Sequence, residues 1–448
     1  MMGNDFEYLL NYDLTVQTLG KTDYNSPLNL SEKYGDSIVN FVPDNERILS
    51  INTEEQLDYC IKNNIKIPSF EKAGPRSKLF FKPGETISAI VTCGGLCPGL
   101  NDVIRSLVIM NYYRYGNKVT YGFKYGYEGF IDEYHHEILN LTPRTVLDIN
   151  KIGGTILGSS RGPQDVGKIV DKLVELNVSV LYTIGGDGTL RGALDISNEI
   201  KKRNLKIAII GIPKTIDNDI SFINKSFGTE TAFSKACDSI FSAHTEARGS
   251  YNGVGLVKVM GRHSGFIAAN ATLATNEVNF VLIPEIPFKL HGENGFLNAL
   301  KKRLNHNKHA VILVAEGAGQ DLVESTESSF DASGNKKLFD IGLFLQNEIK
   351  TYFKKENIPI TIKYIDPSYI IRSTSTTAND SIFCFQLAQR AVHAGMSGKT
   401  GIVVGYYRNE FIHIPISVAV SKRQTIDPES ELWLSVLETT GQPIKFTE

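Results

Sequence analysis

One event repeats from residue 86 onward and constrains the fold more than any other feature of the chain. A run of apolar, largely β-branched residues ends in glycine and polar residues, and a helical pattern follows. The runs are ISAIVTC, VSVLYTI, KIAIIGI, GVGLVKV, VNFVLI and HAVILVA, and the predicted helices cover residues 190–202, 230–246, 263–275 and 295–305. Strands that are apolar throughout and separated by helices predict an α/β fold with mostly parallel sheets.

Length and charge narrow the function. The chain has 448 residues, of which 42% are hydrophobic, so it can bury the cores of two or more domains. A net charge of −2 gives no electrostatic case for binding nucleic acid or a membrane surface. The N-terminus does not resemble a secretory signal, and an odd number of cysteines, five, suits a reducing compartment, so we expect a cytoplasmic protein.

In a parallel sheet, ligands bind outside the carboxyl ends of the strands, so the residues after each run are the candidates. CGGLCPGLN follows the first run, and its glycines, Gly94 among them, let a backbone approach a ligand closely. GGTILGSSRGP ends with Arg161 and Gly162, where the guanidinium suits phosphate oxygens. The alternatives are a tight turn without a ligand and a surface salt bridge.

The stretch IGGDGT follows the second run and places Asp187 among glycines. A hard oxygen donor beside a phosphate-binding turn suits Mg²⁺, which takes one or two carboxylates together with substrate phosphates. The alternative is an aspartate that caps the next helix.

The stretch PKTIDND follows the third run. In an extended segment Asp217, Asp219 and Thr215 face the same way, so the two carboxylates could divide proton transfer and orientation between them. Lys214 adds a positive charge that suits a phosphoryl group in transfer. The alternative is ordinary turn chemistry.

Arg262 of VMGRHSG and Glu316 of VAEGAG occupy two further strand ends. Neither is specific alone. Together with the glycine turns and the two aspartates they predict a phosphoryl-transfer or sugar-phosphate site.

In chain order GGLCPGLN, GGDGTLRGA, PKTIDND, VMGRHSG, VAEGAG and YIIRS resemble the 6-phosphofructokinases over roughly residues 80–420. The subgroup is the one whose sequences are similar to pyrophosphate-dependent enzymes while many members use ATP. The resemblance implies two Rossmann-like domains, a homotetramer or homodimer and an allosteric enzyme of glycolysis. The predicted segments are an N-terminal extension (1–85), a nucleotide-binding domain (86–228, joined by part of 372–420), a sugar-phosphate-binding domain (229–371) and a C-terminal segment (421–448).

The resemblance also implies roles for single residues. Asp217 is the general base for the 1-hydroxyl of fructose 6-phosphate, supported by Thr215, Asp219, Lys214 and Arg262, and Asp187 holds Mg²⁺. The donor ATP is bound by Gly94, Arg161, Gly162, Gly186, Asp187, Gly188 and Thr189. The sugar phosphate is bound by Thr215, Ile216, Asp217, Met260, Gly261, Arg262, Glu316, Tyr369 and Arg372, with Lys363 a weaker candidate.

Three positions depart from the bacterial pattern of this family. Lys214 stands in place of glycine, Tyr369 in place of histidine, and Gly253 in place of an arginine that reaches the neighbouring subunit. The identity of the residue that completes the 6-phosphate pocket therefore stays open, with Arg248 one alternative.

Gly188 and Lys214 bear on the choice of phosphoryl donor. Pyrophosphate-dependent relatives typically carry aspartate where this chain has Gly188, and a carboxylate there would occupy the path of ATP and repel its phosphates. Lys214 favours pyrophosphate, but a long lysine can swing aside. The prediction is therefore ATP, with a pyrophosphate-dependent enzyme as the alternative. The remote alternatives are an NAD-kinase-like or lipid-kinase-like enzyme, because GGDGT also occurs there, and a non-catalytic regulatory subunit.

Overall fold

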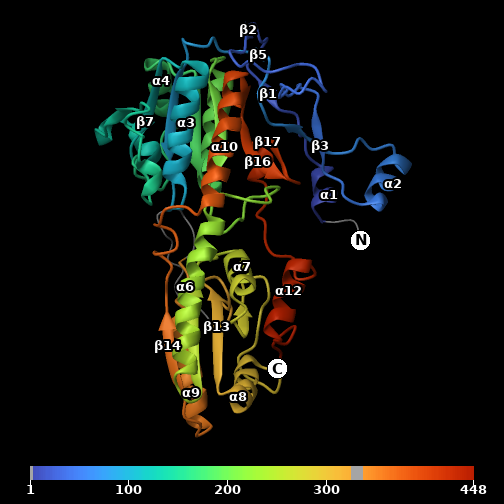
Figure 1. Cartoon of the computed structure of the whole chain (residues 1–448), viewed down its shortest axis with the longest axis vertical. Helices are drawn as coiled ribbons and strands as arrows, with labels where there is room; N and C mark the ends of the chain where they lie inside the picture. The colour runs from blue at the N-terminus through green and yellow to red at the C-terminus, as the bar shows by residue number, and fades with distance from the viewer. Residues whose placement is uncertain (1–3, 324–336) are drawn as a thin grey trace. The chain divides into compact units, whose positions relative to one another are not determined.

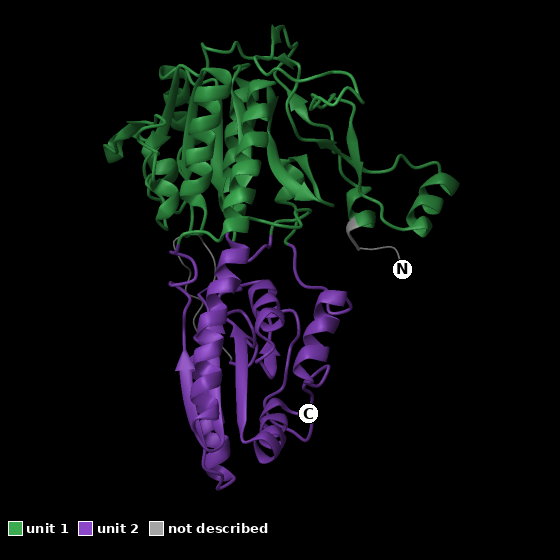
Figure 2. Ribbon diagram, in the orientation of Figure 1, with its two compact units in different colours: residues 1–215, 220–227, 375–423 green, residues 216–219, 228–374, 424–448 purple. Residues whose placement is uncertain are grey.

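The computed structural model describes residues 4–323 and 337–448 of the chain. They divide into two compact units, which Figure 2 draws in different colours. Unit 1 comprises residues 1–215, 220–227 and 375–423, and unit 2 comprises residues 216–219, 228–374 and 424–448. The predicted extension and the predicted sugar-phosphate domain each include residues outside the described ranges, and the bounds of all four predicted segments stay predictions.

Unit 1 is built on a nine-stranded sheet. In spatial order its strands are β3 (Arg47–Leu49), β4 (Ser69–Lys72), β17 (Glu410–Pro415), β16 (Ile402–Tyr407), β10 (Ala208–Pro213), β9 (Val180–Gly185), β6 (Ile87–Thr92), β7 (Val119–Phe123) and β8 (Ile138–Asn140). The five strands from β16 to β7 are parallel, and the pairs outside them are antiparallel. The predicted α/β class with mostly parallel strands is confirmed.

The direction of the connections changes in the middle of this sheet. The chain goes from β6 through α3 (Leu100–Tyr115) to β7 on one side, and from β9 through α5 (Asp187–Lys202) to β10 on the other. Because such crossovers are right-handed, α3 and α5 lie on opposite faces, and the adjacent strands β6 and β9 form a topological switch point. Ligands of open parallel sheets bind beside the carboxyl ends of such a pair.

Helices cover both faces of this sheet. Helix α3 packs beside α10 (Ala378–Met396), as Figure 1 shows, and α4 (Val166–Glu175) packs beside α5. The strands β6, β9 and β10 are almost completely buried, as the uninterrupted apolar runs predict. The smaller elements of unit 1 are α1 (Asn4–Leu9), β1 (Gln17–Thr18), β2 (Tyr24–Asn25), α2 (Glu54–Lys62), β5 (Lys78–Leu79), η1 (Gly126–Phe130), η2 (Asp132–Tyr134), η3 (Ile149–Lys151), β15 (Lys399–Thr400) and α11 (Ile416–Ala419).

Unit 2 has its own four-stranded parallel sheet and its own apolar core. The strand order is β12 (Phe280–Leu282), β13 (His309–Ala315), β11 (Gly253–Val259) and β14 (Thr361–Ile365). Its helices are α6 (Thr229–Arg248), α7 (Phe266–Thr275), α8 (Phe296–Asn307), α9 (Ile341–Lys355) and α12 (Glu431–Thr440).

One predicted helix begins later than expected. The pattern predicts a helix from residue 263, whereas α7 begins at Phe266. Residues 261–265 form a loop instead, because Gly261 has a φ of +128° and a Cβ there would stand 2.5 Å from the carbonyl oxygen of Ser264. The other three predicted helices are observed with ends that differ by at most three residues. No helix in residues 4–323 and 337–448 combines the length and apolarity that crossing a membrane needs.

Candidate functional site

The first candidate turn follows β6. Gly94 has a φ of +85°, which favours glycine. Its N–H donates to the carbonyl oxygen of Ser160 at 3.0 Å, and the hydroxyl of Ser159 donates to the carbonyl oxygen of Gly94 at 2.5 Å. Thr92 anchors the same loop through a 2.7 Å hydrogen bond to the carbonyl oxygen of Gly158. The loop that leads to Arg161 therefore lies against the glycine turn. Sequence reasoning missed the two serines, although they stand beside Arg161 in GSSRGP.

The second turn follows β9 and opens α5. A Cβ on Gly185 would stand 2.1 Å from the hydroxyl oxygen of Thr189, so only glycine fits there. Gly188 is the opposite case: it is exposed, and apart from Gly188, its two chain neighbours and the backbone of α5, no atom of the described residues lies within 4 Å of the place where its Cβ would stand. The first turn of α5 presents its backbone N–H groups at this point, which is the environment that anions prefer.

Asp187 is the first residue of α5, and its side chain is 23% exposed. Its carboxylate accepts a hydrogen bond from Nε of Arg191 at 3.1 Å and lies 3.7 Å from Nη2 of Arg423. No group of three or more histidine, cysteine or acidic side chains that could hold a metal exists within the described part of the chain. One carboxylate together with phosphate oxygens and water is nevertheless a ligand set that Mg²⁺ accepts, so Asp187 fits that ion.

Lys214 joins the two turns. Its backbone N–H donates to the carbonyl oxygen of Gly185 at 3.0 Å, and its ammonium donates to the carbonyl oxygen of Gly95. The residue is only 5% exposed, and its Nζ lies 3.4 Å from the place where a Cβ on Gly94 would stand. The structure therefore brings Gly94, the turn that contains Gly186, and Lys214 together.

The other candidate residues of unit 1 are Arg161, Gly162 and Thr189, predicted to bind the donor, and Thr215, predicted to bind the sugar phosphate. Arg161 is exposed, and Gly162 follows it with a φ of +100°. Thr189 is buried, and its carbonyl oxygen accepts a hydrogen bond from the hydroxyl of Tyr127 at 2.8 Å. The carbonyl oxygen of Thr215 accepts a hydrogen bond from Ser226 at 2.6 Å. These contacts fix the backbone of Thr189 and Thr215.

In unit 2, Asp217 lies against the loop that follows β11. Its carboxylate accepts a hydrogen bond from the backbone N–H of Arg262 at 3.4 Å, and its carbonyl oxygen accepts one from the hydroxyl of Ser264 at 2.7 Å. Gly261, whose conformation only glycine tolerates, shapes this loop. Asp219 is held through its carbonyl oxygen by the N–H of Gln424 at 2.9 Å. Two of the predicted residues, Asp217 and Arg262, are therefore in direct contact.

Glu316 follows β13, beside the same loop. Burial raises the pKa of its carboxyl above the usual value, and the nearby cations of Arg262, Lys258 and Arg372 oppose that rise. The guanidinium of Arg372 lies 4.7 Å from the ring centroid of Tyr369, which is 74% exposed. The other predicted residues of unit 2 are Ile216, which is buried, Met260, which is half-buried, Gly261, and Lys363, whose Nζ lies 3.5 Å from the carboxylate of Glu246.

Sequence reasoning missed Lys258, which stands inside the apolar run of β11. Its ammonium lies 2.8 Å from Asp340 and 2.9 Å from Asp366. Burial alone would lower the pKa of Lys258, but the two carboxylates outweigh burial and raise it. The only signal in the sequence is a charged residue inside a strand that is otherwise apolar.

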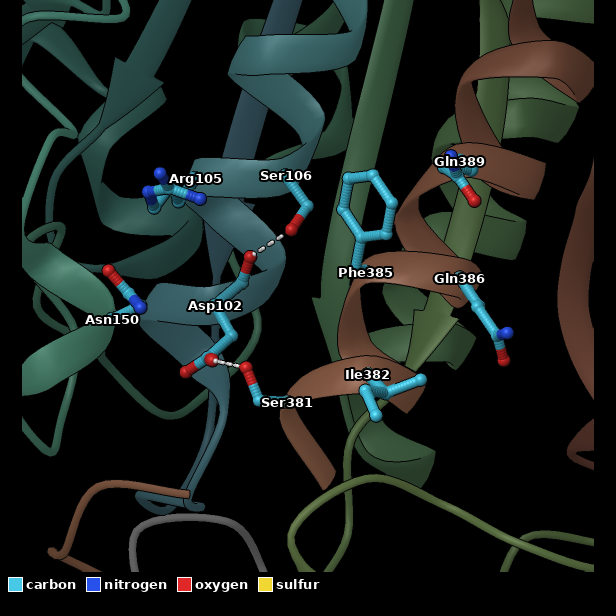
Figure 3. Close-up of a pocket in the computed structure, with 9 residues that line it drawn as sticks. All are labelled: Asp102, Arg105, Ser106, Asn150, Ser381, Ile382, Phe385, Gln386 and Gln389. Atoms are coloured by element: carbon cyan, nitrogen blue, oxygen red, sulfur yellow. Dashed lines mark hydrogen bonds between the residues drawn. The ribbon is translucent and has the colours of Figure 1, made fainter. Parts of the chain in front are cut away.

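A cavity of about 390 Å³ lies between α3 and α10 in unit 1 (Figure 3). Asp102 and Arg105 line it from α3, and Ile382 and Phe385 line it from α10. Asp102 accepts a hydrogen bond from Ser381 at 2.9 Å, and burial raises the pKa of its carboxyl. None of the described residues that were predicted as site residues lines this cavity.

Comparisons with known proteins agree on one family. A model described as phosphofructokinase matches residues 88–395. The chain is 47% identical to an ATP-dependent 6-phosphofructokinase of Borreliella burgdorferi, covering 97% of this chain and 98% of that protein. It is 45% identical to an ATP-dependent 6-phosphofructokinase of Amycolatopsis methanolica, covering 97% and 96%. Among solved structures it is similar in fold to a pyrophosphate-dependent phosphofructokinase of Marinobacter aquaeolei, with a TM-score of 0.66, 18% identity, and coverage of 81% and 93%.

Proposed function

We propose that the protein transfers the γ-phosphoryl group of ATP to O1 of fructose 6-phosphate, because the chain belongs to the phosphofructokinase family. The products are ADP and fructose 1,6-bisphosphate. The observation that carries the choice of donor is Gly188, an exposed glycine beside Asp187 whose Cβ would point into open space. That free space at the start of α5 suits the α-phosphate and ribose of ATP.

Asp217 acts as the general base for the acceptor sugar. Its carboxylate accepts the proton of the 1-hydroxyl as the O1–Pγ bond forms and the bond from Pγ to the bridging oxygen of ATP breaks. The N–H of Arg262, 3.4 Å from that carboxylate, orients it. Arg262, Arg372 and Glu316 bind the phosphate and the hydroxyls of the sugar.

The binding of the donor falls to the two glycine turns. The backbone around Gly94 and Gly186 and the N-terminus of α5 bind phosphate oxygens, and the ammonium of Lys214 adds positive charge beside Gly94. Asp187 would hold Mg²⁺, which would supply positive charge to neutralise the phosphoryl group in transfer. Arg191 and Arg423, both beside Asp187, are placed to contact the same phosphates.

The proposal also includes a cytoplasmic location and a homodimeric or homotetrameric, allosterically regulated assembly. These three points stay predictions from the sequence. Lys214 supports one second candidate, a pyrophosphate-dependent enzyme, because its ammonium lies on the glycine turn where a short donor would bind.

Purified protein incubated with ATP, Mg²⁺ and fructose 6-phosphate tests the proposal. We expect sugar-dependent release of ADP and, by ³¹P NMR, a new phosphomonoester signal from the 1-phosphate. Omission of the sugar is the control. ADP release that does not depend on fructose 6-phosphate would overturn the proposed activity.

A further inference from the structure

Lys258 is a charged residue of unit 2 whose contacts the proposed function does not use. It lies on β11 two residues before Met260 and four before Arg262, and its side chain is 12% exposed. A nearly buried lysine is costly unless carboxylates compensate its charge, and here two do. The question is what this pair of contacts holds in place.

Asp366 connects Lys258 to the turn that carries two predicted substrate-binding residues. One carboxylate oxygen of Asp366 lies 2.9 Å from Nζ of Lys258. The other accepts hydrogen bonds from the backbone N–H of Ser368 at 3.1 Å and from its hydroxyl at 2.5 Å. A single side chain therefore shapes the start of the turn and ties it to β11.

The rest of the turn depends on that start. The N–H of Ile371 donates to the carbonyl oxygen of Pro367 at 3.0 Å, and Ile371 is completely buried. The hydroxyl of Ser373 donates to the carbonyl oxygen of Tyr369 at 2.7 Å, and Arg372 packs over the Tyr369 ring. Tyr369 itself is exposed, so the turn is held by its two ends and by the buried Ile371.

Asp340 is the second partner of Lys258. It is the N-cap of α9, where one carboxylate oxygen accepts the N–H of Leu343 at 3.1 Å and the hydroxyl of Tyr364 at 3.2 Å. Its other oxygen lies 2.8 Å from Nζ of Lys258. Lys258 is thus the shared cation that ties the helix start and the turn to the strand that ends in Met260 and Arg262.

We propose that Lys258, acting through Asp366, is a positioning residue that holds Arg372 and Tyr369 in register with Arg262 for binding of the sugar phosphate. This inference rests on the proposed function and extends it to a residue that does not touch the substrate. Misplacement of a phosphate-binding arginine by as little as 1 Å can cost up to about 100-fold in rate, so an indirect contact of this kind is measurable.

Steady-state kinetics of Lys258→Met and Asp366→Asn in the full chain test the inference. Both variants should raise the KM for fructose 6-phosphate by about tenfold and leave the KM for ATP within about twofold. Lys258→Arg keeps the charge and should recover most of the affinity for the sugar. Asp340→Asn keeps a capping side chain on α9 and removes only the charge that faces Lys258, while the contact between Lys258 and Asp366 remains. It should therefore change the KM for the sugar much less than Asp366→Asn.

Lys301→Met is the matched control. Lys301 pairs with Glu356, which lies at the other end of α9 from Asp340. The substitution therefore breaks a lysine–carboxylate contact in the same unit without touching the turn that carries Tyr369 and Arg372. An unchanged sugar KM in both Lys258→Met and Asp366→Asn, or an equal rise in Lys301→Met, overturns the inference while the proposed function stands. If Lys258→Met does not fold, Asp366→Asn decides by the same criterion. A wild-type protein without turnover of fructose 6-phosphate overturns both.

Discussion

The two units carry their candidate groups in different ways. In unit 1 the groups proposed for the donor are mostly backbone: glycine turns after β6 and β9 and the N-terminus of α5, with Lys214 and Asp187 as the charged additions. In unit 2 the groups proposed for the acceptor are charged side chains at strand ends, among them Asp217, Arg262 and Glu316, and further ion pairs surround them. On this proposal, the space left open beside the backbone of unit 1 decides which donor binds, whereas paired side chains of unit 2 select the acceptor.

The largest effect should come from the side chain that performs chemistry. Asp217→Asn keeps the shape but cannot accept the proton of the 1-hydroxyl, so kcat should fall by about 10²–10⁴-fold while substrate affinity changes little. Quenched-flow or coupled-assay kcat together with sugar binding by calorimetry measure both quantities. Asp219→Asn is the comparison variant and should lose much less. Near-normal kcat in Asp217→Asn would remove this residue from the mechanism.

The backbone site of unit 1 should fail when a side chain is added. Gly188→Asp places a carboxylate in the proposed path of ATP, and like charges juxtaposed in this way cost several kcal/mol, so kcat/KM for ATP should fall by about 100-fold. Gly188 does not have a positive φ and its Cβ position is open, so the variant should fold normally.

Gly188→Asn separates size from charge, because it is nearly the same shape without the charge. We expect it to lose less ATP-dependent activity than Gly188→Asp. Since Lys214 is already in place, Gly188→Asp should also gain measurable use of pyrophosphate. Full ATP activity in Gly188→Asp would contradict the argument about size and charge.

The charged site of unit 2 should respond in one substrate only. Arg372→Ala removes a contact between a guanidinium and a phosphate, and a hydrogen bond to a charged group is worth about 1.5–3 kcal/mol, so the KM for fructose 6-phosphate should rise about 10- to 100-fold. The KM for ATP should change little. Arg372→Lys keeps the charge without the bidentate geometry, so its KM for fructose 6-phosphate should lie between those of the wild-type protein and Arg372→Ala. An equal rise in both KM values would mean that Arg372 supports the fold instead.

The two units should also differ in how much stability they lose as the pH falls. In unit 1, burial together with neighbouring cations holds the pKa of His393 at about 3, so its contribution to stability is present above pH 6.5 and is lost as the pH falls. That loss is on the order of 3 kcal/mol between pH 6.5 and about pH 4. Glu71 adds to this loss of stability below pH 4.5. Neighbouring His413 and cations outweigh the effect of burial and hold the pKa of the Glu71 carboxyl at about 2.

In unit 2, burial raises the pKa of Glu285 and Glu316, so acidification favours their folded, protonated state. This gain opposes the loss from His244, whose pKa burial lowers. The single tryptophan, Trp433, is buried in unit 2 and reports on that unit alone. Thermal melts at pH 7 and pH 4.5 should therefore show a larger drop in Tm by far-UV circular dichroism than by tryptophan fluorescence. His393→Gln should reduce the difference. An equal drop by both probes would contradict this assignment.

The same contrast explains what the sequence could predict. Buried parallel strands are apolar on both faces, and glycines follow them in the sequence. The sequence therefore indicates the strands β6, β9, β10, β11, β12 and β13 and the turns after them. β14 was not recognised, because its residues are half-exposed and alternate with polar ones. The place of β4 in the large sheet is equally hidden, since β4 pairs with β17, more than 300 residues away, and no local pattern encodes such a partner. β3 joins the sheet only through β4.

Among the candidate site residues, the sequence indicated which groups stand at strand ends but not what holds them. Ser159 and Lys258 act through contacts with segments 65 and 108 residues distant. The neighbours of Asp187 include Arg423, which is still more remote in the chain. Such pairings depend on tertiary packing, and a single sequence does not show it.

The central claim is that an open glycine beside a metal-binding aspartate makes ATP the donor. Side-by-side measurement of kcat/KM for the wild-type protein with ATP and with pyrophosphate, at saturating fructose 6-phosphate and Mg²⁺, tests it most directly. The account predicts robust turnover with ATP and at least about tenfold less with pyrophosphate, as expected when binding energy from the nucleotide is required. Equal or faster turnover with pyrophosphate would contradict it.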